Sequence, residues 1–217
     1  MRNPFQIPDA PDYQTERPQS RLKLTKQISD SHCGPAVLEM LFSHLDIHAD
    51  QEQITEAAGA RHRIKEHGLR IDQLAKATAN LAPRAQFWYK EHAEIEDIDT
   101  LIHEYNYPIG VEWQNLFYET EEAEYEDTEG AYYDFGHYSI VKDIHLGNDE
   151  IVMIDPYHAF AGRDRYFSLQ FFEHRWWDVN QIDINGLVRY KRDTRVMFIV
   201  TPKGMYFPKM IGMKPLP

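Results

Sequence analysis

The chain has 217 residues, of which 42% are hydrophobic, and its 35 acidic and 23 basic residues give a formal net charge of −12. This length and apolar content fit a single globular domain and argue against global disorder. The negative charge disfavours nucleic acid and an anionic membrane surface as partners, whereas a neutral or basic small partner is compatible with it.

The N-terminal region is predicted to be an arm followed by a strand. Residues 1–20 carry four prolines, which remove backbone donors and block helices, so we expect an extended arm. The alternation of Leu22 and Leu24 then predicts a short strand over 21–26.

Helices are predicted for most of the next 80 residues. Apolar side chains recur at helical spacing after Cys33, and Pro35 suits a first helical turn. Asp50 and Gln53 resemble a capping box, which marks the start of a second helix. The predicted helices cover 33–45, a stretch beginning after Asp50, 69–81 and, beyond a strand at 85–89, 94–105.

The second half is predicted to be rich in antiparallel strands. Gly147 and Asn148 give a hairpin signal, and Ser168 is a candidate N-cap for a short helix over 169–177. Strands are predicted at 108–113, 137–144, 150–154, 187–190 and 195–201. Helices that precede strands in this way favour an α+β fold over a doubly wound sheet.

Domain boundaries follow from these patterns. We expect an arm at 1–20, one domain over 21–202, and a tail at 203–217 whose Met and aromatic residues pack on the body. The N-terminus lacks the apolar run of a signal peptide, and the apolar runs are too short to span a bilayer. A chain with one cysteine cannot form an internal disulfide, so a cytoplasmic location is expected.

The only cysteine, Cys33, stands where a nucleophile would be activated. It precedes Gly34 and Pro35 at the start of a predicted helix, whose free N–H groups and partial positive charge stabilise an anion. Gly34 keeps the approach to the sulfur open. Alone, however, a free cysteine is more often a buried structural thiol.

His137 and Asp155 are the candidate base and its orienting partner. His137 follows Gly136 at the mouth of a predicted strand, and Gly136 leaves room beside the imidazole. Asp155 ends the neighbouring strand of the predicted hairpin, so the two side chains are expected to lie close together. The adjacent His32 is a weaker candidate, because sequence neighbours point in different directions.

Gln27 is the candidate oxyanion donor. Its side-chain amide lies six residues before Cys33 and can curl back towards a developing oxyanion, to which the Cys33 N–H would also donate. Trp113 is a candidate lining residue of a substrate cleft. No cofactor and no metal is expected: His44 and His48 are four residues apart, but Asp46 and Ile47 between them indicate that the helix has ended before His48.

These motifs resemble the C39-like branch of the papain-like cysteine peptidases. The resemblance runs from about 21 to 201 and is strongest at Gln27, Cys33-Gly34-Pro35-Ala36, Gly136-His137-Tyr138 and Asp155-Pro156. It implies a papain-like fold, in which a helical part with the cysteine packs on an antiparallel β-sheet with the histidine. It also implies that Cys33 is the nucleophile, His137 the base, Asp155 the orienter and Gln27 the oxyanion donor.

The resemblance implies a cysteine hydrolase that acts on a peptide or amide bond through an acyl-thioenzyme. Two alternatives stay open: transfer of the acyl group to an amine, and a peptide-binding module of the same fold without catalysis. The acidic insertion at 116–130 is either a solvated loop, the favoured interpretation, or a rim that selects a cationic substrate. The oligomeric state is left open.

Overall fold

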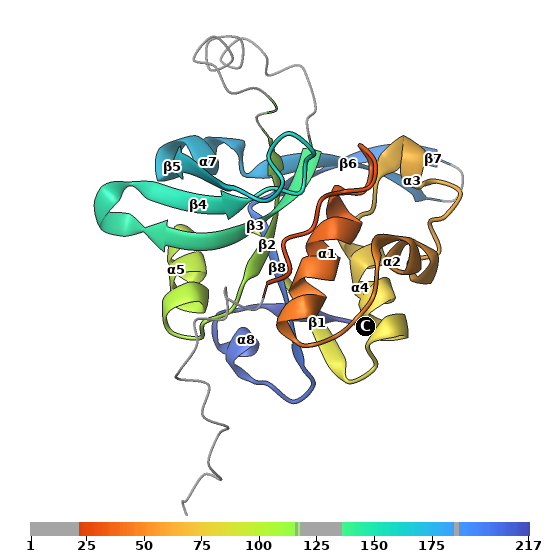
Figure 1. Cartoon of the computed structure of the whole chain (residues 1–217), viewed down its shortest axis with the longest axis horizontal. Helices are drawn as coiled ribbons and strands as arrows, with labels where there is room; N and C mark the ends of the chain where they lie inside the picture. The colour runs from red at the N-terminus through yellow and green to blue at the C-terminus, as the bar shows by residue number, and fades with distance from the viewer. Residues whose placement is uncertain (1–21, 116, 118–135, 185–186) are drawn as a thin grey trace, which may run out of the picture.

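A seven-stranded antiparallel sheet forms the centre of the molecule, with helices on both faces (Figure 1). A computed structural model of the protein describes residues 22–115, 117, 136–184 and 187–217. The strand order in the sheet is β5-β4-β3-β2-β8-β1-β9, and β6 and β7 form a separate two-stranded hairpin. This architecture confirms the expected α+β class, with a helical part packed on an antiparallel sheet.

The predicted helices are present. The Asp50 side chain accepts a hydrogen bond from the Gln53 backbone N–H, and the Gln53 side chain accepts one from the Asp50 N–H, so the capping box forms as the sequence predicted. Ser168 caps the later helix by accepting from the Phe171 backbone. The helices are α1 (Cys33–His44), α2 (Gln51–Ala57), α3 (Ile64–His67), α4 (Ile71–Leu81), α5 (Ile95–His103), α7 (Leu169–Arg175) and α8 (Phe207–Met210).

The strands predicted from residue 85 onwards are present, and three further strands, β5, β6 and β9, were not predicted. A short 3₁₀ turn, η2 (Leu146–Asn148), joins β3 to β4 where the hairpin signal lies. The strands are β1 (Ala85–Lys90), β2 (Ile109–Gln114), β3 (Gly136–His145), β4 (Glu150–Ile154), β5 (Asp164–Ser168), β6 (Trp177–Ile184), β7 (Leu187–Thr194), β8 (Val196–Pro202) and β9 (Lys214–Leu216).

Alternation along the strands separates two hydrophobic cores. On β8, Phe198 and Val200 pack with α1, α2 and α4, whereas Met197 and Ile199 face the opposite side with α5 and α7. Figure 1 shows the same division, with α1, α2 and α4 on one side of the sheet and α5 on the other. The N-terminus of α1 is thereby fixed against β3, the strand that carries His137.

The strand predicted over 21–26 is wrong. Residues 22–27 are extended but belong to no ladder, and the Gln27 N–H donates to the Pro156 carbonyl at 2.9 Å. Leu22 is buried at 7% exposure whereas Leu24 is 46% exposed, although i and i+2 residues of a regular strand share one face. The alternation of leucines therefore did not reflect pairing.

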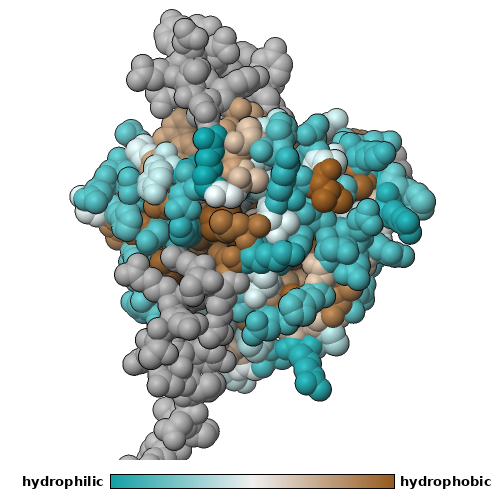
Figure 2. All heavy atoms as spheres, viewed as in Figure 1, coloured by the Kyte–Doolittle hydropathy of each residue, from teal (hydrophilic) through white to brown (hydrophobic). Residues whose placement is uncertain are grey.

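The C-terminal segment packs on the body. Phe207 in α8 and Met213 are buried in the core beside α5, and β9 extends the sheet by pairing with β1. Residues 1–21, which include the expected arm, lie outside the described residues. On the face drawn in Figure 2, most surface side chains are hydrophilic and a limited hydrophobic area lies near the centre. Within the described ranges, none of the helices is long and apolar enough to cross a bilayer.

Candidate active site

Cys33 is the first residue of α1 and its thiol is free. Among the described residues, the helix has neither a side-chain cap at His32 nor an acidic residue in its first turn, so its N-terminal field is not neutralised locally. Cys33 is buried, with 8% of the residue exposed. The neighbouring His32 is turned to Ser29, whose hydroxyl lies 2.6 Å from its Nδ1.

His137 and Asp155 meet as the hairpin predicted. Strands β3 and β4 are paired with Ile140 opposite Ile154, which brings the residue after β4 back towards the start of β3. His137 Nε2 lies 2.8 Å from Asp155 Oδ1, and both side chains are almost completely buried. Since Nε2 is occupied, Nδ1 is the ring nitrogen left for the Cys33 thiol, which interacts with the imidazole.

The electrostatics of the pair favour a charged imidazole and a charged carboxylate. Burial alone lowers the pKa of His137, but Asp155 and then Cys33 outweigh it and raise the pKa to about 10. Burial alone raises the pKa of Asp155, but His137, the Tyr157 N–H and Arg165 hold it well below its usual range. His137 therefore carries its second proton at neutral pH.

Two residues that the sequence analysis did not single out complete the surroundings of Asp155. Its Oδ2 accepts hydrogen bonds from Asn115 Nδ2 at 2.9 Å and from an Arg165 guanidinium nitrogen at 2.6 Å. Its Oδ1 accepts from the Tyr157 N–H at 2.8 Å in addition to His137. Both oxygens of the carboxylate are thus fixed in position.

Gln27 lies in the segment that leads to Cys33, and its role as oxyanion donor stays a prediction. It is buried, its backbone is bonded to Pro156, and its Nε2 donates to the Ser29 carbonyl at 2.8 Å. An amide nitrogen carries two hydrogens, so one donor remains beyond the Ser29 bond. The bond to Ser29 holds the amide in a fixed orientation.

Gly34 and Gly136 are closely packed positions, whose role in substrate binding stays a prediction, and Trp113 is buried. A Cβ on Gly34 would lie 3.2 Å from the Tyr138 ring, and one on Gly136 would lie 2.2 Å from Asp178, so each position requires close packing. Trp113 has no exposed surface and its Nε1 donates to Ser139. It is a core residue beneath the sheet, and the expectation that it lines a cleft is corrected.

An aromatic ring shields the histidine. Phe117 packs edge-on against His137, with ring centroids 5.4 Å apart, and against Tyr157 at 4.8 Å. An apolar ring at this position keeps water from competing for the hydrogen bond between His137 and Asp155. Apart from Phe117, the acidic segment 116–130 lies outside the described residues.

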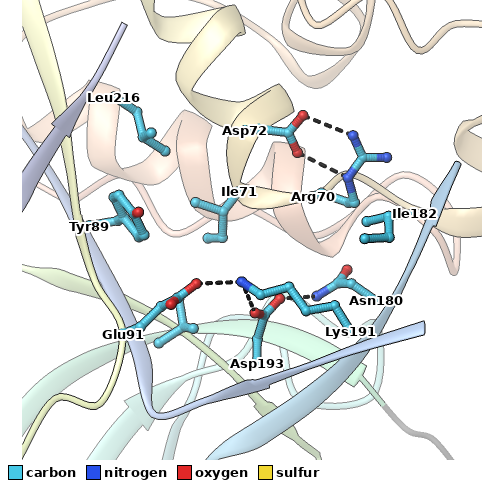
Figure 3. Close-up of a pocket in the computed structure, with 11 residues that line it drawn as sticks. Arg70, Ile71, Asp72, Tyr89, Glu91, Asn180, Ile182, Lys191, Asp193 and Leu216 are labelled. Carbon is cyan, nitrogen blue, oxygen red and sulfur yellow. Dashed lines mark hydrogen bonds and ion pairs between the residues drawn. The ribbon is translucent and has the colours of Figure 1, made fainter. Parts of the chain in front are cut away.

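A pocket of about 270 Å³ lies between the N-terminus of α4 and the β6–β7 hairpin (Figure 3). None of the predicted site residues lines this pocket. The two elements that form its walls, α4 and β6, each contact a residue next to the site. Leu74 of α4 is 3.5 Å from the Cβ position of Gly34, and Asp178 of β6 packs against Gly136. The pocket has an apolar centre and paired charges, and its lining residues are Arg70, Ile71, Asp72, Tyr89, Glu91, Asn180, Ile182, Lys191, Asp193, Val196 and Leu216.

The floor of this pocket is connected to the residues beneath the cysteine by hydrogen bonds. Asn180 Nδ2 donates to Asp193 Oδ2 and to Glu112 Oε1, both at 3.0 Å, and Glu112 also accepts from the Tyr138 hydroxyl at 2.7 Å. Burial raises the pKa of Glu112 against the lowering effect of these bonds. Tyr138 in turn lies under Gly34, so the pocket and the cysteine share one polar support.

Two solved structures with a similar fold are a peptidase domain and a protease. The peptidase domain of Streptococcus ComA, a bifunctional ABC transporter in a quorum-sensing pathway, superposes with a TM-score of 0.56 at 17% identity, over 84% of this chain and 99% of that one. A double-glycine-motif protease from an AMS/PCAT transporter, in complex with the leader peptide, gives a TM-score of 0.51 at 16% identity, over 84% of this chain and 92% of that one.

At this identity the two structures establish the fold alone. No curated protein matches the chain in sequence. The sequence profile described as the Peptidase_C39 like family, in contrast, matches residues 19–183, about three quarters of the chain and all three residues that meet at the site. The chain belongs to the Peptidase_C39 like family.

Proposed function

We propose that the protein is a cysteine peptidase that cleaves a peptide or amide bond through a Cys33 acyl-thioenzyme. One observation carries the proposal: Cys33, at the N-terminus of α1, interacts with an imidazole whose Nε2 lies 2.8 Å from Asp155. A thiol, a base and an orienting carboxylate in this order are what nucleophilic catalysis requires.

The reaction follows from the geometry. The Cys33 thiolate attacks the carbonyl carbon, and the oxyanion accepts hydrogen bonds from the Cys33 N–H and from the free Nε2 hydrogen of Gln27. The His137 imidazolium gives its Nδ1 proton to the leaving amine, and the C–N bond breaks. Neutral His137 then takes a proton from water, and the resulting hydroxide attacks the thioester carbonyl. The C–S bond breaks, the acyl group leaves as a carboxylate, and the pair of Cys33 thiolate and His137 imidazolium is restored.

A peptide is the proposed substrate class. A neighbour of the same fold is in complex with a leader peptide, and the net charge of −12 favours a basic peptide over an acidic one. The reaction belongs in a reducing compartment, for which we propose the cytoplasm, because an oxidised Cys33 could not attack.

Labelling of the thiol tests the proposal. Iodoacetamide at pH 6 should alkylate Cys33 at least about tenfold faster than a model thiol, because helix N-terminus and imidazolium stabilise the thiolate. His137→Ala should remove this advantage, whereas His174→Ala, at an exposed position of α7, should keep it. Labelling at the model rate in the native chain would contradict the activated thiolate.

We propose that the pocket of Figure 3 binds a side chain of the substrate. Asn180 lies two residues along β6 from Asp178, about 7 Å at strand geometry, so an extended peptide at Cys33 would reach the pocket within a few residues. Glu91 and Asp193 both bind Lys191 at 2.5 Å, and Arg70 is paired with Asp72, which leaves an apolar centre with one surplus carboxylate.

Substitution of Ile182 tests this proposal. Ile182→Arg fills the apolar centre, so KM for a peptide substrate should rise about tenfold while the alkylation rate of Cys33 stays unchanged. Tyr190→Ser is the matched control, because Tyr190 is 73% exposed on the paired strand and does not line the pocket. Equal KM values for both variants would place the peptide elsewhere.

A further inference from the structure

We propose that Arg165 is a positioning residue of the site, which holds Asp155 and balances its charge. This inference rests on the proposed function, since it concerns the orientation of the same histidine. Arg165 is on β5, opposite Met153, and its guanidinium reaches the far side of the carboxylate that His137 uses. Its guanidinium binds Asp155 Oδ2, and the proposed effect on the imidazole passes through this carboxylate.

The contacts of Arg165 fix its guanidinium from several directions. One guanidinium nitrogen donates to Asp155 Oδ2 at 2.6 Å and to Asn115 Oδ1 at 2.8 Å. The guanidinium carbon lies 3.7 Å from the centroid of the Phe160 ring, which is fully buried, and 4.8 Å from that of Phe167. A cation sandwiched between aromatic faces and a carboxylate has little freedom to move.

Asn115 is held by a second arginine. Arg175 is buried and donates through Nε to the Gln114 carbonyl at 2.6 Å and through a terminal nitrogen to the Asn115 carbonyl at 2.8 Å. This fixes the end of β2, so that Asn115 Nδ2 also meets Asp155 Oδ2. Arg165 and Asn115 therefore form a clamp on one carboxylate oxygen and leave the other for His137.

The clamp also balances charge in a dry site. In the proposed reactive state, the attacking thiolate, the imidazolium and the carboxylate would together carry one net negative charge, which a buried site tolerates poorly. The guanidinium of Arg165, 9% exposed, brings the sum to zero. Removing it should loosen the carboxylate and misorient the imidazole, which lowers the rate of the chemical step without changing the affinity for peptide.

Kinetics and a spectroscopic signal test the positioning role. Arg165→Gln should lower kcat about 10²-fold with KM unchanged. Arg165→Lys, which keeps the charge but not the fork, should recover part of this loss. Arg163→Gln is the matched control, because Arg163 is an exposed neighbour that donates to Ala159 O and lies farther from the Phe160 ring, at 5.3 Å. Equal kcat in Arg165→Gln and Arg163→Gln would overturn the inference.

A second measurement separates this inference from the proposed function. In the Cys33→Ala background, the low-field proton resonance of His137 Nε2 should persist with Arg163→Gln and disappear with Arg165→Gln, whether or not Cys33 is a nucleophile. If Arg165→Gln does not fold, Arg165→Lys and Asn115→Ala take its place. A retained resonance together with native kcat in both would overturn the positioning role.

Discussion

Replacing Cys33 by alanine should abolish peptide cleavage and thiol labelling together. The thiol is the only one in the chain, and it is the group that interacts with His137 at the N-terminus of α1. Removal of a nucleophile that works with its base typically costs about 10⁶-fold in kcat. Cys33→Ser should be nearly as inactive, because a hydroxyl at this site is not ionised by a helix N-terminus and an imidazolium.

The fold should survive this substitution. The side chain that is lost is small, so the loss of its burial should lower the free energy of unfolding by less than about 1 kcal/mol. Circular dichroism and thermal unfolding would check this alongside activity. Loss of turnover in an unchanged fold separates a chemical role of the thiol from the structural role that buried free cysteines commonly have.

The double variant gives the sharper result. If Cys33 and His137 act as a unit, then Cys33→Ala with His137→Ala should be no less active than either single variant. Peptide turnover by the two single variants, the double variant and the native chain gives a double-mutant cycle. His174→Ala, at an exposed position, is the control. Residual cleavage in Cys33→Ala above that of the double variant would mean that another group attacks the substrate.

The fold was predictable where local signals and packing agree. The capping residues Asp50 and Ser168 start helices where the sequence predicts them, and the apolar run of β8 becomes a strand that is buried up to its last residue, Pro202. Strands β5 and β6 were missed because they are polar, with residues such as Arg165 and Asn180 serving a buried network in place of an apolar face. Leu22 and Leu24 misled because alternation without a pairing partner makes no strand.

The sequence predicted which residues come together at the site, but not the residues that hold Asp155. Cys33, His137 and Asp155 stand at the ends of elements that the sequence indicates clearly, so their convergence follows from the hairpin and the helix start. Trp113 was misplaced although Ile109 and Val111 share its side of β2, and this alternation was the available signal that it is buried. The role of Arg165 could not be predicted from the sequence, because Arg165 comes close to Asp155 only when β5 pairs with β4.

Asp155→Asn should cause the second large effect, on both rate and stability. An amide that keeps its oxygen towards His137 and Tyr157 presents an NH₂ group to Arg165 and Asn115, both of which donate to that side. The donor groups of Arg165 and Asn115 then face the NH₂ group of the asparagine in place of an accepting oxygen. We expect kcat to fall by up to about 10⁴-fold, as for loss of an orienting carboxylate in a hydrolytic triad.

The same change leaves a buried guanidinium without its counter-charge, which typically costs about 3–5 kcal/mol in the free energy of unfolding. Asp164→Asn is the matched control, because Asp164 precedes Arg165 on β5 and its ion pair with Lys142 is partly exposed. Its loss should cost no more than about 1 kcal/mol. Urea unfolding of the native chain, Asp155→Asn and Asp164→Asn at pH 7 measures the change in the free energy of unfolding for each variant.

The pH dependence gives the sign of each charge. The pKa of Asp155 lies below its unfolded value, so the stability it contributes is present above about pH 4 and is lost as the pH falls. The pKa of His137, about 10, lies above its unfolded value, so its contribution is complete below about pH 6.5 and is lost as the pH rises towards 10. In Asp155→Asn, the free energy of unfolding should depend less on pH at both the acidic and the basic end. The pKa of His137, followed by NMR, should fall, because the carboxylate no longer opposes the effect of burial. A His137 pKa that stays near 10 in this variant would show that Asp155 is not the group that holds the proton on the imidazole.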